Sequence, residues 1–185
     1  TTTTPIIREL PADQSRKTHL FDRGSWLMPG EEVSPGIPGV YGVNSTKHLE
    51  DRLAFARWLV SRENPLAARV VVNRFWEQLF GFGIVESMEE FGTQGAPPTQ
   101  PELLDWLAVR FMDTHDWKMK PLLRELLLSA TYRQSSDADS VKIEKDPLNQ
   151  WLSRGARTRL TSEQIRDQIL AVSGLLDRTI GGPSM

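Results

Sequence analysis

The stretch "NPLAARVVVNRFWEQLFGFG", residues 64–83, decides the fold of this chain. Asparagine before proline is a helix-start signal, because the Asn64 side chain can cap the first turn and proline is favoured in the first helical position. Gly81 can adopt the left-handed conformation that ends a helix. The sequence therefore predicts a helix from Pro65 to Leu79 or Phe80.

Polar side chains gather on one side of this otherwise apolar helix. At 100° per residue, Arg69, Asn73 and Glu77 fall on one narrow strip, flanked by Arg74, and Val71, Val72, Phe75 and Leu79 face the opposite way. Buried polar groups must be paired. One interpretation is an internal network in which Arg69 and Arg74 pair with carboxylates such as Glu77 or Asp105, since a guanidinium satisfies several acceptors at once. The other is a pocket for an anionic group. Polar networks commonly hold irregular segments in place, which favours the first interpretation.

Helical spacing continues on both sides of this stretch. Thr161 and Gln164 form a capping box that opens a last helix, which we expect to reach about Leu176. Three other helices are predicted over residues 47–62, 101–114 and 119–130, and "PLNQWLSRG" favours a short helical turn. The predicted fold is mainly α: a compact bundle of about five helices with short β-like pieces such as "THLFDRG" and an irregular Pro/Gly-rich N-terminal strap.

Residues 1–46 form this strap, and residues 47–185 form the helical domain. The run "MPGEEVSPGIPGVYG" is rich in proline and glycine, which fix or free the backbone against helix formation. The strap also carries Trp26, Leu27, Ile37 and Val40, large apolar groups that free linkers seldom contain. We therefore expect it to lie packed over the helices.

Composition excludes several classes of protein. Lys plus Arg number 22 and Asp plus Glu 24, a net charge of −2, so there is no basic footprint for nucleic acid. The chain contains no cysteine, which rules out disulfides and thiolate metal sites within it. Its three histidines are scattered, so we expect no metal. The strongest apolar runs are too short to span a bilayer.

Two further groups of residues are candidates for a site. Arg154, Arg157 and Arg159 precede the last helix, whose free N–H groups favour an anion, although such arginines are also common in packing. The Gly/Pro loop "FGTQGAPPTQPELLDW" contains Gln94 and Thr99, which could hydrogen-bond sugar hydroxyls, with Trp106 stacking on a ring.

Several long stretches resemble one known family. "RLAFARWLVSRENPLAARVVVNRFWEQLFGFGIVES", "EEFGTQGAPPTQPELLDWLA", "LLLSATYRQSS" and "LTSEQIRDQILAVSGLLDRTIGGPS" are similar, in this order, to the helical domain of unknown function numbered 1553, abundant in planctomycetes. The resemblance implies an exported, multidomain protein with a cytochrome-c-like domain upstream, so any haem would lie outside this chain. It also implies that this chain is a fragment with both ends internal. No catalytic residue is carried over.

Two functions remain open after these observations. The first is a non-catalytic interaction and scaffold domain, with other domains of the same polypeptide or other proteins as partners. The second is a carbohydrate-active module that binds or cleaves acidic polysaccharide, sulfated or carboxylated. Assembly into a large oligomer is a third possibility, which exposed apolar surface on the strap would favour. No nucleic acid is expected as a partner.

Overall fold

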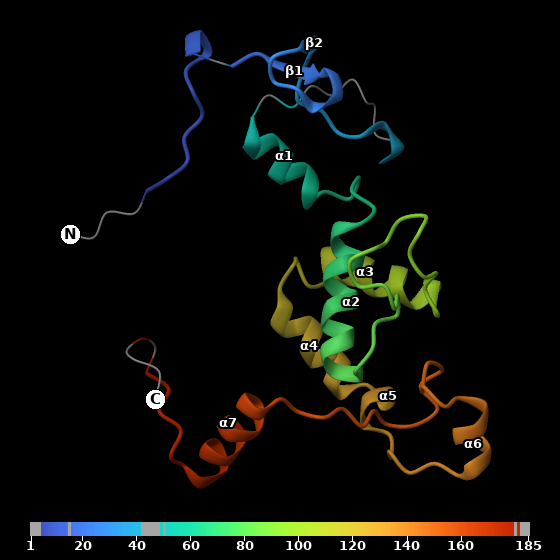
Figure 1. Ribbon diagram of the computed structural model, residues 1–185. Coiled ribbons are helices and arrows are strands. Elements are labelled where there is room, and N and C mark those ends of the chain that lie inside the picture. The colour runs from blue at the N-terminus through green and yellow to red at the C-terminus, as the bar shows by residue number, and fades with distance from the viewer. Residues whose placement is uncertain (1–4, 15, 42–48, 50, 180, 182–185) are drawn as a thin grey trace.

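The computed structural model describes residues 5–14, 16–41, 49, 51–179 and 181 (Figure 1). Two strands, β1 (Thr18–Phe21) and β2 (Pro29–Val33), form an antiparallel hairpin. The α-helices in the described part are α1 (Arg52–Leu59), α2 (Ala67–Phe80), α3 (Pro101–Asp113), α4 (Met119–Leu128), α5 (Ala130–Arg133), α6 (Ser140–Lys145) and α7 (Ser162–Ser173). The mainly α prediction is confirmed. The two helices beyond the expected five or so are the short α5 and α6.

Local signals set the ends of α2. The side-chain Oδ1 of Asn64 accepts hydrogen bonds from the backbone N–H groups of Leu66 and Ala67, at 2.8 and 3.1 Å, so it satisfies two donors at the start of α2. The helix itself begins at Ala67, two residues after the predicted start. It ends at Gly81, which has a φ of 84° as the left-handed closure requires.

The main core lies where α2, α3 and α4 meet (Figure 1). Trp76 and Phe80 of α2 stack with ring centroids 4.1 Å apart, and the Tyr132 ring meets Phe80 edge-on. Burial of each large side chain contributes about 1.5–3 kcal/mol. The buried core residues are Ala68, Val72, Trp76, Phe80, Ile84, Val85, Leu104, Leu107, Ala108, Phe111, Leu122 and Leu126.

The buried face of α2 differs from the predicted one. Its centre is Trp76 and Phe80, and Asn73 lies on the same side, whereas Val71, Phe75 and Leu79 are only half-buried. The reason is that α3, α4 and the segment around Ile84 and Val85 together cover the side of α2 that carries Asn73, Trp76 and Phe80.

The chain after α3 departs from simple helices in two places. The predicted helix over 119–130 breaks at Ser129, whose hydroxyl oxygen accepts from the Tyr132 N–H and so starts α5 as a separate turn. The segment 146–155 forms tight turns instead of a helical turn, because Asn149 and Leu152 both adopt positive φ, 57° and 56°.

The N-terminal segment is less buried than the sequence predicts. Ile37 is 7% exposed and packs with Leu49 and Trp58 in a second small cluster. In contrast, Trp26 is 75% exposed, and Leu27 and Val40 are also exposed, so these three side chains do not cover the helices. Local composition cannot tell whether an apolar side chain finds a partner far away in the sequence. The proposed boundary at residue 46 lies outside the described residues.

The last helix, α7, begins at the predicted capping box and extends away from the core (Figure 1). The Thr161 hydroxyl accepts from the Gln164 N–H at 3.3 Å, and the Gln164 carbonyl oxygen accepts from the Thr161 N–H at 3.0 Å. The helix ends at Gly174, slightly before the predicted Leu176, and contains no buried residue. Among the described helices, none is long and apolar enough to cross a membrane.

Candidate functional site

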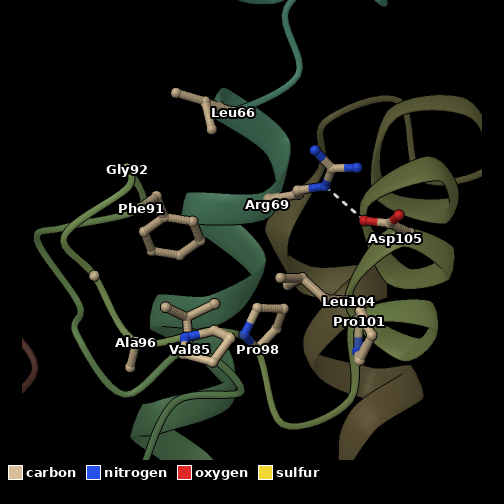
Figure 2. Close-up of a pocket in the computed structure, with 12 residues that line it drawn as sticks. Leu66, Arg69, Val85, Phe91, Gly92, Ala96, Pro98, Pro101, Leu104 and Asp105 are labelled. Atoms are coloured by element: carbon tan, nitrogen blue, oxygen red, sulfur yellow. Dashed lines mark hydrogen bonds and ion pairs between the residues drawn. The ribbon is translucent and has the colours of Figure 1, made fainter.

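A hollow of about 400 Å³ opens between the first halves of α2 and α3 and the loop that joins the two helices. Figure 2 shows Phe91, Val85 and Pro98 on the loop side and Leu104 and Pro101 on the side of α3. The full lining is Leu66, Arg69, Val85, Phe91, Gly92, Gly95, Ala96, Pro97, Pro98, Pro101, Leu104 and Asp105. The walls are mainly apolar, with one cation and one carboxylate at the rim.

The rim charges neutralise one another. Arg69 Nε donates to Asp105 Oδ1 at 2.6 Å, and Arg69 Nη1 donates to the Pro65 carbonyl at 3.0 Å, so the guanidinium links α2 to α3 and to its own first turn (Figure 2). Both side chains are partly exposed, at 36% and 53%. An ion pair this exposed contributes at most about 1 kcal/mol.

Asn73 does not line the hollow, but it fixes Val85, which does. Its amide is fully buried, donating from Nδ2 to the Val85 carbonyl at 2.9 Å and accepting at Oδ1 from the Val85 N–H at 2.9 Å. This reciprocal pair satisfies the backbone of a segment that belongs to no helix or strand. Asn73 is therefore a structural group that fixes Val85, and it has no polar atom left for a ligand.

The rest of the polar strip on α2 lies outside the hollow. Arg74 is exposed and Glu77 is half-buried, and neither side chain forms a hydrogen bond or ion pair with the residues that the structure describes. The structure thus brings together Arg69, Asn73 and Asp105 around one loop and leaves Arg74 and Glu77 apart from them.

The three loop candidates are not brought to one place. Thr99 donates both its N–H and its hydroxyl to the Ile84 carbonyl, at 2.8 and 3.2 Å, which closes the base of the loop. Gln94 is exposed on the loop. Trp106 lines a different, apolar cleft of about 370 Å³ between α3 and α4, with the Arg110 guanidinium 4.9 Å from its ring centroid.

The three arginines before α7 line a second hollow, of about 640 Å³, against the end of α2. Arg154 donates to the backbone carbonyls of Asp146 and Pro147, at 2.8 and 2.9 Å. Arg157 forms an exposed ion pair with Asp137, and Arg159 is exposed with no described partner. The N-terminus of α7, closed by its capping box, is not part of this lining.

Sequence reasoning missed a charged cluster between α3 and α4. Glu125 Oε2 lies 2.6 Å from His115 Nε2, and Glu125 Oε1 lies 2.8 Å from Arg110 Nε. Burial alone would raise the pKa of Glu125, but the hydrogen bond with His115 and the ion pair with Arg110 outweigh burial and lower that pKa below its usual value of 4.5. No sequence signal pairs these residues, because the contact depends on how the turn between the helices folds.

Sequence reasoning also missed a buried polar cluster in segment 146–155. Asp146 and Asn149 are 6% and 7% exposed, and the Asp146 carboxylate accepts from the Trp151 N–H at 3.1 Å. Asn149 Nδ2 donates to the Arg154 carbonyl, and Asn149 Oδ1 accepts from the Arg154 N–H. This buried polar cluster holds segment 146–155 in its turns and explains why both polar residues are buried.

The first hollow is lined mainly by apolar groups. Its single cation, Arg69, and its single carboxylate, Asp105, are paired with each other, so the hollow offers mainly apolar contact. In the part of the chain that the structure describes, no group of three or more His, Cys, Asp or Glu side chains could hold a metal ion.

Comparison with known proteins gives one match. No curated protein and no solved structure is similar to this chain. The family model described as PSD1, protein of unknown function (DUF1553), matches residues 51–185, which include the seven α-helices of the described residues. The chain therefore belongs to the PSD1 (DUF1553) family of proteins of unknown function.

Proposed function

We propose that this chain is an interaction and scaffold domain that binds another domain of the same, larger polypeptide. The observation that carries the proposal is the apolar face of α7. Ile165, Ile169 and Val172 recur at helical spacing and are 44%, 63% and 85% exposed. An amphipathic helix is stable in water mainly when its apolar face is covered, so this face calls for a partner surface.

The polar side chains add support to this proposal. The hydrogen bonds of three candidate side chains, Arg69, Asn73 and Arg154, are all formed with other groups of this chain. This is expected of side chains that stabilise a scaffold. The exposed Trp26 and Leu27 add further apolar surface in the N-terminal segment.

The wider setting of the domain is part of the proposal. The family resemblance favours an exported protein, in the periplasm or on the cell surface, with haem chemistry on a cytochrome-c-like domain outside this chain. Such an arrangement would give α7 a partner within the same polypeptide.

A carbohydrate-active module is the second candidate. It gains support from the hollow beside Arg157 and Arg159, which has no carboxylate in its lining. Binding of an acidic polysaccharide agrees with that lining, whereas hydrolysis would need two facing carboxyl groups at the bond to be cleaved.

The test uses the domain that adjoins this chain in the polypeptide encoded by the gene, added in trans. We expect it to bind the chain and to slow hydrogen exchange of the α7 amides. Ile169→Asp should weaken binding by about tenfold or more, because it places a charge in the apolar contact. Ala171→Asp is the matched control, since Ala171 is exposed on a different face of the same helix.

Three results would contradict the proposal. They are no binding of the adjoining domain, binding that leaves α7 unprotected, and equal loss with both variants. A chain that dimerises through α7 at micromolar concentration would instead identify a second copy as the partner, and sedimentation velocity distinguishes that outcome.

A further inference from the structure

The hollow between the end of α2 and the segment before α7 has an unusual charge balance. Its lining includes Arg154, Arg157 and Arg159 and no acidic residue, in a chain whose net charge is −2. The other lining residues are Phe80, Gly81, Phe82, Pro147, Leu148, Asn149, Gly155, Ala156 and Thr158.

The buried polar cluster of segment 146–155 fixes the walls of this hollow. Arg154 and Asn149 are fixed by hydrogen bonds within segment 146–155, and the Gly155 N–H donates to the Ser135 carbonyl at 2.8 Å. Gly81 lies so close to Thr158 that an added Cβ would approach Thr158 Cγ2 to 2.6 Å. These contacts preorganise the hollow, which lowers the cost of binding.

Two of the three arginines can turn to a ligand. Arg154 is held away from a ligand, because its guanidinium donates to the backbone carbonyls of Asp146 and Pro147. The ion pair of Arg157 with Asp137 joins side chains that are 71% and 91% exposed, and such a pair is readily exchanged. Arg159 has no partner among the described residues. Its guanidinium and that of Arg157 offer the planar donor forks that oxyanions accept.

We propose that this hollow binds an organic ester of a tetrahedral oxyanion, sulfate or phosphate. The oxyanion pairs with Arg157 and Arg159, and the carbon body of the ligand packs on the apolar wall formed by Phe82, Pro147 and Leu148. The guanidinium groups of Arg157 and Arg159 outweigh the partial negative charge at the C-terminus of α2, so the site favours an anion. The inference is independent of the interaction role proposed for α7, and it deepens the second candidate function, which rests on the same hollow.

Calorimetric titration of the intact 185-residue chain tests this site with glucose 6-sulfate, glucose 6-phosphate, inorganic sulfate and glucose. We expect one or both esters to bind, inorganic sulfate to bind more weakly and glucose not to bind. Arg157→Gln and Arg159→Gln should each lower the affinity roughly tenfold, the value of a charged hydrogen bond. Arg159→Lys, which keeps the charge and loses the fork, should lie in between. Arg166→Gln, at an exposed arginine of α7, is the matched control.

Several results would overturn the assignment. Affinity that survives both Arg157→Gln and Arg159→Gln excludes this hollow, and an equal loss with Arg166→Gln shows unspecific attraction by charge. Inorganic sulfate binding as tightly as the esters removes the role of the apolar wall. If no ester binds at concentrations up to about 10 mM, the binding free energy is weaker than about 3 kcal/mol, and the proposed site is rejected. Circular dichroism of each variant shows whether its fold is intact.

Discussion

At the scale of single residues, Asn73 and Arg69 differ in burial although both lie on the same polar strip of α2. Asn73→Ala would leave the N–H and the carbonyl of Val85 buried without partners, so we expect a loss of about 3 kcal/mol in the free energy of unfolding. Arg69→Ala removes a half-exposed ion pair and should cost less than about 1 kcal/mol. Urea denaturation monitored by tryptophan fluorescence measures both.

Arg74→Ala is the control for these two variants, because Arg74 is exposed on the same helix. We expect it to change the unfolding free energy by no more than about 0.5 kcal/mol. Equal losses for Asn73→Ala and Arg74→Ala would show that the bonds to Val85 contribute nothing to stability.

Glu125 sets part of the acid stability. Its pKa is lower in the folded chain than the ordinary value of 4.5, so its contribution is fully present above that value and is lost as the pH falls through the folded pKa. We therefore expect the native chain to lose more unfolding free energy between about pH 7 and about pH 3 than Glu125→Gln does. Urea titrations at both pH values provide the comparison. Parallel losses in the two proteins would assign the acid sensitivity to other groups.

At the scale of elements, the sequence predicts those whose signals are local. The cap at Asn64, the closing Gly81 and the box of Thr161 and Gln164 are read from neighbours in the chain, and all three are present in the structure. The break at Ser129 was missed, because the residues after it continue to favour a helix.

The candidate sites depend on contacts between distant segments, which no local pattern encodes. Asp105 could be named as a partner of Arg69, but nothing in the sequence indicates that Asn73 binds Val85 or that Glu125 meets His115. The sequence also does not indicate the positive φ of Asn149 and Leu152, which sets the shape of the second hollow.

The loop between α2 and α3 allows a test with paired glycines. A Cβ at Gly95 would collide with the Glu90 backbone carbonyl, which cannot move without reshaping the loop, whereas at Gly92 it would meet only the end of the flexible Glu90 side chain. We expect Gly95→Ala to cost about 2 kcal/mol, in the range of overpacked sites, and Gly92→Ala much less. Thermal unfolding of both variants measures the difference. Equal melting temperatures would mean that the loop is not held as described.

At the scale of the whole molecule, burial is uneven. One core joins α2, α3 and α4, a small cluster around Trp58 holds α1, and α7 buries no residue in either. The exposed apolar side chains of α7 and of the N-terminal segment therefore add little to the stability of the chain alone. These side chains stabilise the molecule only when another surface covers them, and for this reason we infer a partner for them.

This unevenness predicts how the intact chain exchanges its amide hydrogens. A helix of 12 residues with no buried face is marginal in water, so α7 should exchange rapidly through local fraying. The amides of α2 and α3, which enclose the main core, should exchange only through global unfolding and so far more slowly. Hydrogen exchange followed by mass spectrometry resolves the two classes in one experiment. If α7 were as slow as α2 in the chain alone, its apolar face would already be covered in solution, and the partner inferred for it would have to bind elsewhere.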